Sequence, residues 1–245
     1  MSYTYFTWKN AASDVREYVE ELSQGAAVDY FRGNFFVNTP DILNEYLVSG
    51  GRAAFRIRLL LAATLSPVYG VYSGFELCEN TPLKPGSEEY LDSEKYQLKP
   101  RDWNAAGNIN DDIARINTIR REYAALQRAD NVTFHPSDNP AILFYRRVAE
   151  PSAKQWVGSH WQTIPGIIAR PGVRDLFIAV TTDAKTPQET VVHVPIAEMG
   201  IGEGEPYVVR DLLTGAKYTW RGERNYVRLD PAVEPAHIFV VERLI

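Results

Sequence analysis

The most informative stretch is Phe35-Phe36-Val37-Asn38-Thr39-Pro40-Asp41-Ile42-Leu43, a short apolar run that stops at polar residues and then presents one carboxylate. Its apolar part, bounded by Gly33 and Pro40, is typical of a strand buried on both faces of a parallel sheet. Pro40 lacks the N–H that a sheet ladder needs, so we expect the strand to end there. Asp41 then follows the carboxyl end of a strand, where parallel α/β folds place their chemistry. From the pattern alone, the more frequent alternative is that Asp41 is the N-cap of a helix starting at Ile42.

Strand and helix patterns alternate around this stretch. Positions 15, 18, 19 and 22 are apolar at helical spacing, with Ser13 as the expected N-cap and Gly25 as the stop. The predicted elements are a strand over residues 3–8, that helix, the strand at 35–37, a loop through Gly50-Gly51, a helix from about Ala53 to Ala63, and a strand over 68–72. Such alternation predicts a parallel sheet wrapped by helices.

A long irregular segment, Asn80 to Gly107, follows, and its aromatic residues favour an ordered loop. Isoleucines at helical spacing then predict a helix from Ile109 to Leu126, capped by Asn108 or Asn110. Beyond Gln127 short strand patterns recur between turns, at 141–145, 176–180, 191–194, 207–209, 217–220, 226–229 and 238–241. Thr214-Gly215 and Arg221-Gly222 have the composition of hairpin turns. We therefore expect an α/β part over residues 1–127 and an antiparallel β-sandwich over 128–245.

Composition narrows the functional classes. The chain has 245 residues, 45% of them hydrophobic, and a net charge of -5, which argues against nucleic acid as a main partner. The longest apolar run, Leu59 to Leu65, is far too short to cross a bilayer, so no membrane association is expected. Cys78 is the only cysteine, which excludes an internal disulfide and a thiolate metal site and favours a reducing, cytoplasmic location. Residues 1–8 lack the features of a secretory signal, so we expect the chain to begin within a domain.

Neither a metal nor a cofactor is expected. The four histidines, His135, His160, His193 and His237, have no spacing typical of a metal site. Gly50-Gly51 lacks the spacing of a phosphate-binding or dinucleotide loop.

The opening stretch resembles the last shared motif of the α-amylase superfamily (glycoside hydrolase family 13), in which Asn-His-Asp at the end of the seventh barrel strand supplies an Asp that holds sugar hydroxyls. Here Thr39-Pro40 replaces the His. The resulting Asn-Thr-Pro-Asp-Ile-Leu is similar to the branch of α-1,4-glucan:maltose-1-phosphate maltosyltransferases. The stretches that agree with that branch are Ser2 to Trp8, Ala62 to Pro67, Tyr72 to Asn80 and Asp92 to Tyr96.

This resemblance implies the last three strand and helix units of a (β/α)8 TIM barrel, followed by a β-domain. It implies a retaining double displacement in which Asp41 is the transition-state stabiliser, while Lys95 and Tyr96 bind the donor maltosyl unit. The family's nucleophile and acid lie on the fourth and fifth barrel strands, which are missing here, so Glu76, Glu79 and Asp92 are not assigned these roles. The resemblance also implies maltose 1-phosphate and α-1,4-glucan as substrates, a homodimer, and a chain that is inactive alone.

Other interpretations stay open. The chain is alternatively a fragment of a related glucan hydrolase or isomerase, or a non-catalytic glucan-binding remnant. Asp92, Glu94 and Lys95 alternatively form a solvated charge cluster. Glu76 is expected to be structural, and Trp156, Trp161 and Trp220 to be core or interface residues more often than glucan contacts.

Overall fold

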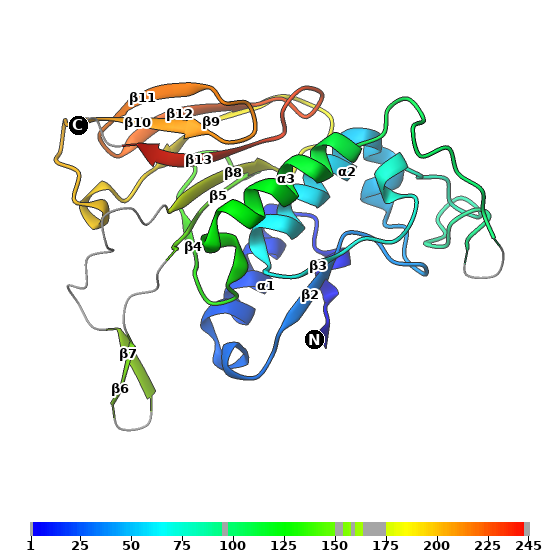
Figure 1. The fold of residues 1–245 in the computed structure, drawn as a ribbon, viewed down its shortest axis with the longest axis horizontal. Coiled ribbons are helices and arrows are strands. Elements are labelled where there is room, and N and C mark those ends of the chain that lie inside the picture. Colours follow the sequence, from blue (N-terminus) through cyan, green and yellow to red (C-terminus); the bar gives the residue numbers. More distant parts are fainter. Residues whose placement is uncertain (1, 95–97, 150–153, 158–159, 164–174, 243–245) are drawn as a thin grey trace.

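The structure, a computed structural model, describes residues 2–94, 98–149, 154–157, 160–163 and 175–242, with 154–157 and 160–163 described by their backbone alone (Figure 1). The α-helices are α1 (Ala12–Gln24), α2 (Glu45–Leu65) and α3 (Asn110–Glu122). Short 3-10 helices are η1 (Tyr5–Trp8), η2 (Ala26–Asp29), η3 (Phe75–Leu77), η4 (Ala124–Gln127) and η5 (Ile196–Met199). The strands are β1 (Ser2–Tyr3), β2 (Gly33–Phe36), β3 (Tyr69–Gly70), β4 (Val132–His135), β5 (Ile142–Arg147), β6 (Lys154–Val157), β7 (His160–Thr163), β8 (Leu176–Thr181), β9 (Gln188–His193), β10 (Pro206–Asp211), β11 (Lys217–Arg221), β12 (Arg224–Leu229) and β13 (Ala236–Glu242).

Three parallel strands in the order β1-β2-β3 lie in the first part of the chain. Tyr3 pairs with Asn34, and Phe35 pairs with Tyr69. Helix α1 connects β1 to β2, and α2 connects β2 to β3, as parallel pairing requires. The predicted alternation of parallel strands with helices is therefore confirmed.

The first strand is much shorter than predicted. β1 ends at Tyr3, and residues 5–8 form η1 instead of continuing the strand over 3–8. Phe6 is fully buried, and its ring stacks on that of Phe35 with centroids 4.4 Å apart. The aromatic pattern thus marks a helical turn that buries Phe6.

Helix starts also differ from the sequence prediction. Helix α1 has Ala11 as its N-cap, and Ser13 lies inside the helix, where its hydroxyl contacts Asp14 Oδ1 at 3.3 Å. The expected loop through Gly50-Gly51 is only a kink within α2, at Gly51 with φ 54°, a conformation that glycine adopts without the steric cost a Cβ would bring. At α3 the N-cap is Ile109, so neither Asn108 nor Asn110 holds the predicted position, although Asn108 Oδ1 accepts a hydrogen bond from the Asn110 N–H at 3.0 Å.

The second part of the chain is an antiparallel β-structure, as predicted. A six-stranded sheet has the order β11-β10-β13-β8-β5-β4, and β12 pairs with β9 in a separate sheet. Gly215 (φ 78°) turns the β10–β11 hairpin, which confirms the Thr214-Gly215 prediction. Arg221-Gly222 is not a hairpin turn, because it joins strands of two different sheets.

The six-stranded sheet is the middle of three layers. Its alternating residues face opposite sides, as the pleat requires. Phe144, Phe177 and Phe239 pack with residues of β9 and β12 on one side. On the other side, apolar residues of β5, β8 and β13 join the core formed with α1 and α2, namely Leu143, Tyr145, Leu176, Ile178, Val180, Ile238 and Val240. One hydrophobic core therefore crosses the expected boundary near residue 127.

None of the helices in the described ranges is long and apolar enough to cross a membrane.

Candidate active site

The carboxyl ends of the three parallel strands form one edge of the sheet, and the candidate site residues were predicted to lie at this edge. Chain segments leave this edge after β1, β2 and β3, and in parallel folds such segments converge on one mouth. Thr7, in η1 after β1, donates from Oγ1 to the Phe36 carbonyl at the end of β2, at 3.3 Å. The segments after β1 and β2 are thus in direct contact.

Asp41 lies at the exposed tip of a tight turn after β2. Thr39 and Ile42 close the turn by exchanging backbone hydrogen bonds of 3.4 and 3.3 Å. Thr39 Oγ1 also accepts from the Asp41 N–H at 3.3 Å. The N-cap of α2 is Asn44, whose Oδ1 accepts from the Tyr46 N–H at 2.8 Å. The alternative in which Asp41 caps a helix starting at Ile42 is therefore wrong.

Asn38, the residue just before this turn, ties β2 to β3. Its side chain is fully buried. Asn38 Oδ1 accepts from the Tyr72 N–H at 2.9 Å, and Nδ2 donates to the Tyr90 hydroxyl oxygen at 2.8 Å. Burial raises the pKa of Tyr90, so this phenol stays neutral. Sequence analysis missed this role of Tyr90; its only signal was an aromatic residue within a Pro- and Gly-rich loop.

A second anchor lies beyond β3. Arg101 is 3% exposed and lies 3.0 Å from Glu79 Oε1 and 2.7 Å from Glu94 Oε2. Burial alone would raise the pKa of Glu79, but Arg101 and Lys99 outweigh burial and lower it. Glu94 is thus held by a buried guanidinium, so the solvated-cluster alternative does not describe it. No sequence signal pointed to Arg101.

Lys95 and Tyr96 directly follow Glu94 in the chain but lie outside the described residues. Glu76 is structural, as expected, because its Oε2 accepts from the Gly74 N–H at 3.0 Å. Trp220 is 7% exposed and packs against Phe239 with ring centroids 4.9 Å apart, which confirms it as a core residue.

Among the described residues, this edge presents the exposed Asp41 carboxylate, and Glu76 and Glu79 do not form a nucleophile and acid pair. A retaining displacement needs two carboxyl groups about 5 to 5.5 Å apart across the reacting carbon. Glu76 and Glu79 are already engaged by the Gly74 N–H and by Arg101 with Lys99. Within the described ranges, no group of three or more His, Cys, Asp or Glu side chains is placed to hold a metal ion.

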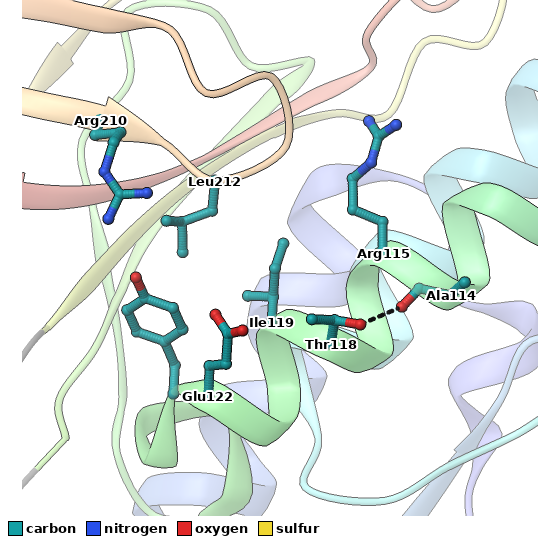
Figure 2. Close-up of a pocket in the computed structure, with 8 residues that line it drawn as sticks. Ala114, Arg115, Thr118, Ile119, Glu122, Arg210 and Leu212 are labelled. Carbon is teal, nitrogen blue, oxygen red and sulfur yellow. Dashed lines mark hydrogen bonds between the residues drawn. The ribbon is translucent and has the colours of Figure 1, made fainter.

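A pocket of about 490 Å³ lies elsewhere, between α3 and the end of β10 (Figure 2). Arg115 donates to the Leu213 carbonyl at 2.9 Å, and Arg210 pairs with Glu242 at 2.7 Å. The residues that line the pocket are Ala114, Arg115, Thr118, Ile119, Glu122, Tyr123, Arg210 and Leu212. None of them belongs to the edge that carries Asp41.

Sequence comparisons identify relatives along the whole chain. The family described as "GLGE, C-terminal" matches residues 134–241. The chain is 48% identical over 246 residues to α-1,4-glucan:maltose-1-phosphate maltosyltransferase 2 of Streptomyces coelicolor, which covers 99% of this chain and 33% of that protein. It is 45% identical over 238 residues to the α-1,4-glucan:maltose-1-phosphate maltosyltransferase of Rhodospirillum rubrum, covering 97% of this chain and 32% of that protein. The chain thus spans about a third of the length of these relatives.

Solved structures agree on the fold. An α-amylase from Geobacillus thermoleovorans superposes with a TM-score of 0.63 at 12% identity, covering 97% of this chain and 46% of that one. An Anoxybacillus α-amylase gives a TM-score of 0.61 at 12% identity, covering 98% of this chain and 44% of that one. The chain is therefore similar, over nearly its whole length, to about a third of α-1,4-glucan:maltose-1-phosphate maltosyltransferases, its residues 134–241 match the carboxyl-terminal family model, and its fold is that of part of an α-amylase.

Proposed function

We propose that this chain is the carboxyl-terminal portion of an enzyme that moves maltosyl units from maltose 1-phosphate to the non-reducing ends of α-1,4-glucans, in α-glucan or glycogen biosynthesis. The observation that carries this proposal is the Asn38-Thr39-Pro40-Asp41 turn, which presents a carboxylate at the carboxyl edge of the parallel strands. The names of the relatives support a transferase over the hydrolase or isomerase alternative.

Asp41 is the proposed transition-state stabiliser. An exposed carboxylate on a turn closed at both ends is preorganised to hold sugar hydroxyls while positive charge develops on the ring. Lys95 and Tyr96 are the proposed donor-binding residues, since an ammonium donates to sugar hydroxyls and a phenol offers a ring face with a hydroxyl. Their neighbour Glu94 is fixed by Arg101.

We propose that residues 1–127 belong to the catalytic barrel and residues 128–245 to the β-domain. The nucleophile and the acid then lie in the part of the relatives that this chain does not span, so the chain alone is inactive. Each described strand of the parallel sheet pairs only within the set β1-β2-β3, whereas a closed (β/α)8 barrel needs eight parallel strands. A cytoplasmic homodimer that uses no cofactor completes the proposal.

A chimera tests this function. Residues 1–245 replace the matching third of the Streptomyces coelicolor enzyme, and inorganic phosphate released from maltose 1-phosphate is measured. The chimera should turn over, and Asp41→Asn should lower kcat by roughly 10²-fold. Glu45→Gln, which changes an exposed carboxylate in the first turn of α2, should leave kcat unchanged.

The isolated chain should release no phosphate. An inactive chimera combined with maltooligosaccharide binding by the chain would favour the non-catalytic remnant instead. A normal kcat for Asp41→Asn would remove Asp41 from the mechanism.

A further inference from the structure

The turn that carries Asp41 is held at both ends by one segment of the long loop. At the start of the turn, Asn38 Nδ2 donates to the Tyr90 hydroxyl oxygen at 2.8 Å. At its exit, the Leu43 N–H donates to the Glu88 carbonyl at 2.5 Å. Residues 88–90 therefore bracket the turn from both sides.

The start of the turn depends on a side chain because the backbone ladder has ended. The last backbone contact between β2 and β3 is the Val37 N–H to the Gly70 carbonyl, at 3.0 Å. Beyond it, the Asn38 amide accepts from the Tyr72 N–H at 2.9 Å and donates to the Tyr72 carbonyl at 3.4 Å. The side-chain amide thus adds one rung to the sheet, directly before Thr39.

Tyr90 in turn fixes the orientation of that amide. Asn38 is fully buried and Tyr90 is 5% exposed, so water does not readily replace either partner. An amide that lost the phenol oxygen would keep one buried N–H unsatisfied, and only its two contacts with the Tyr72 backbone would hold its orientation. The contact between the start of the Asp41 turn and the 88–90 segment would then be lost.

We propose that Asn38 and Tyr90 are positioning residues that set the place of the Asp41 carboxylate, and that the 88–90 segment acts as its brace. The inference rests on the proposed role of Asp41. A displacement of about 1 Å at a reacting group can cost on the order of 10²-fold in rate, so a hydroxyl that never touches the sugar still affects kcat.

Tyr90→Phe in the chimera tests this inference, because it removes one oxygen and leaves the ring in place. We expect kcat to fall about tenfold with little change in KM, since the loss acts on transition-state placement. Tyr72→Phe is the matched control. Its ring lies 5.9 Å from that of Tyr90, but its hydroxyl has no hydrogen-bond partner among the described residues, so kcat should not fall.

A double-mutant cycle separates positioning from general structural damage. In an Asp41→Asn background, Tyr90→Phe should change kcat less than about twofold, because the group that it positions is already gone. An equal loss in both backgrounds would overturn the inference. So would a normal Tyr90→Phe enzyme alongside an impaired Asp41→Asn enzyme, which leaves the role of Asp41 intact.

Backbone hydrogen exchange gives a readout that needs no turnover. In the chimera, the amides of Asp41 and Leu43 should exchange faster after Tyr90→Phe than after Tyr72→Phe. Unchanged exchange at both amides would contradict the brace, whether or not the chimera is active. Asn38→Ser, which shortens the side chain and removes the amide, should reproduce the faster exchange.

Discussion

Arg147 of β5 donates from Nη1 to the carbonyl oxygen of Leu65, the last residue of α2, at 3.0 Å. Its Nε donates to the Ala125 carbonyl at 3.2 Å, and Nη2 donates to the Arg128 carbonyl. The side chain is fully buried, and burial lowers its pKa. A helix ends with unsatisfied carbonyls and a partial negative charge, which a guanidinium complements. One side chain of the β-domain thus holds the end of a barrel helix.

Replacing this guanidinium should therefore be costly. Arg147→Met keeps much of the apolar volume but removes the guanidinium donor from the carbonyls of Leu65 and Arg128, while the Ala125 carbonyl keeps the Asn131 amide as a donor. We expect the free energy of unfolding to fall by about 2 to 4 kcal/mol. Urea denaturation measures this loss, with exposed Arg121→Met as the control. A loss no larger than that of the control would mean that the carbonyls find other partners.

The shared core predicts that the chain unfolds as one unit. Leu143 and Ile178 of the β-domain pack in the same cluster as residues of α1 and α2, so neither part keeps its core when the other unfolds. Thermal unfolding followed by far-UV circular dichroism and by tryptophan fluorescence should give coincident transitions. Residues 128–245 expressed alone should bind a hydrophobic dye, because one face of the six-stranded sheet loses its cover. Two separate transitions would show instead that the boundary near 127 is a thermodynamic one.

A partly buried histidine, His237, predicts how stability depends on pH. Burial alone would lower the pKa of His237, but Asp211 Oδ2, 3.0 Å from Nδ1, and the Arg228 carbonyl outweigh burial and raise it. Because the folded pKa exceeds the unfolded one, this stabilisation is complete below about pH 6.5 and is lost as pH rises through the folded pKa.

His237→Asn should remove this dependence. The difference in unfolding free energy between the chain and the variant should therefore be largest below about pH 6.5 and should shrink as pH rises through the folded pKa of His237. His135, whose pKa is lowered chiefly by burial, contributes the opposite slope and cancels in the difference. A constant difference over this range would exclude His237 as the titrating group.

The donor-binding proposal predicts a change in KM. Lys95→Ala combined with Tyr96→Phe, made in the chimera, should raise KM for maltose 1-phosphate about tenfold and lower kcat less, because binding energy far from the breaking bond is largely uniform. Lys84→Ala, an exposed lysine of the same loop, is the control. Unchanged kinetics in the double variant would remove both residues from the donor site.

The sequence by itself determined the order of elements and the place of Asp41. Apolar runs and helical spacing are local, so they located β2, α1, α3 and most strands of the β-domain. Pro40 lacks an N–H in any surroundings, and β2 ends at Phe36, ahead of that residue. The family motif followed from the same nine residues.

Only the tertiary structure decided how that carboxylate is held. Asn38 contacts Tyr72 and Tyr90, which lie 34 and 52 positions away, and no local pattern specifies such partners. Residues 5–8 form η1 and not the predicted strand, because the burial of Phe6 against Phe35 stabilises the helical turn more than the alternating sequence pattern favours a strand. The burial of Arg147 also depends on tertiary structure, because the carbonyls that accept its hydrogen bonds come together only when the helices pack on the sheet. Contacts between residues distant in sequence depend on how whole helices and strands pack, and local periodicity does not encode that packing.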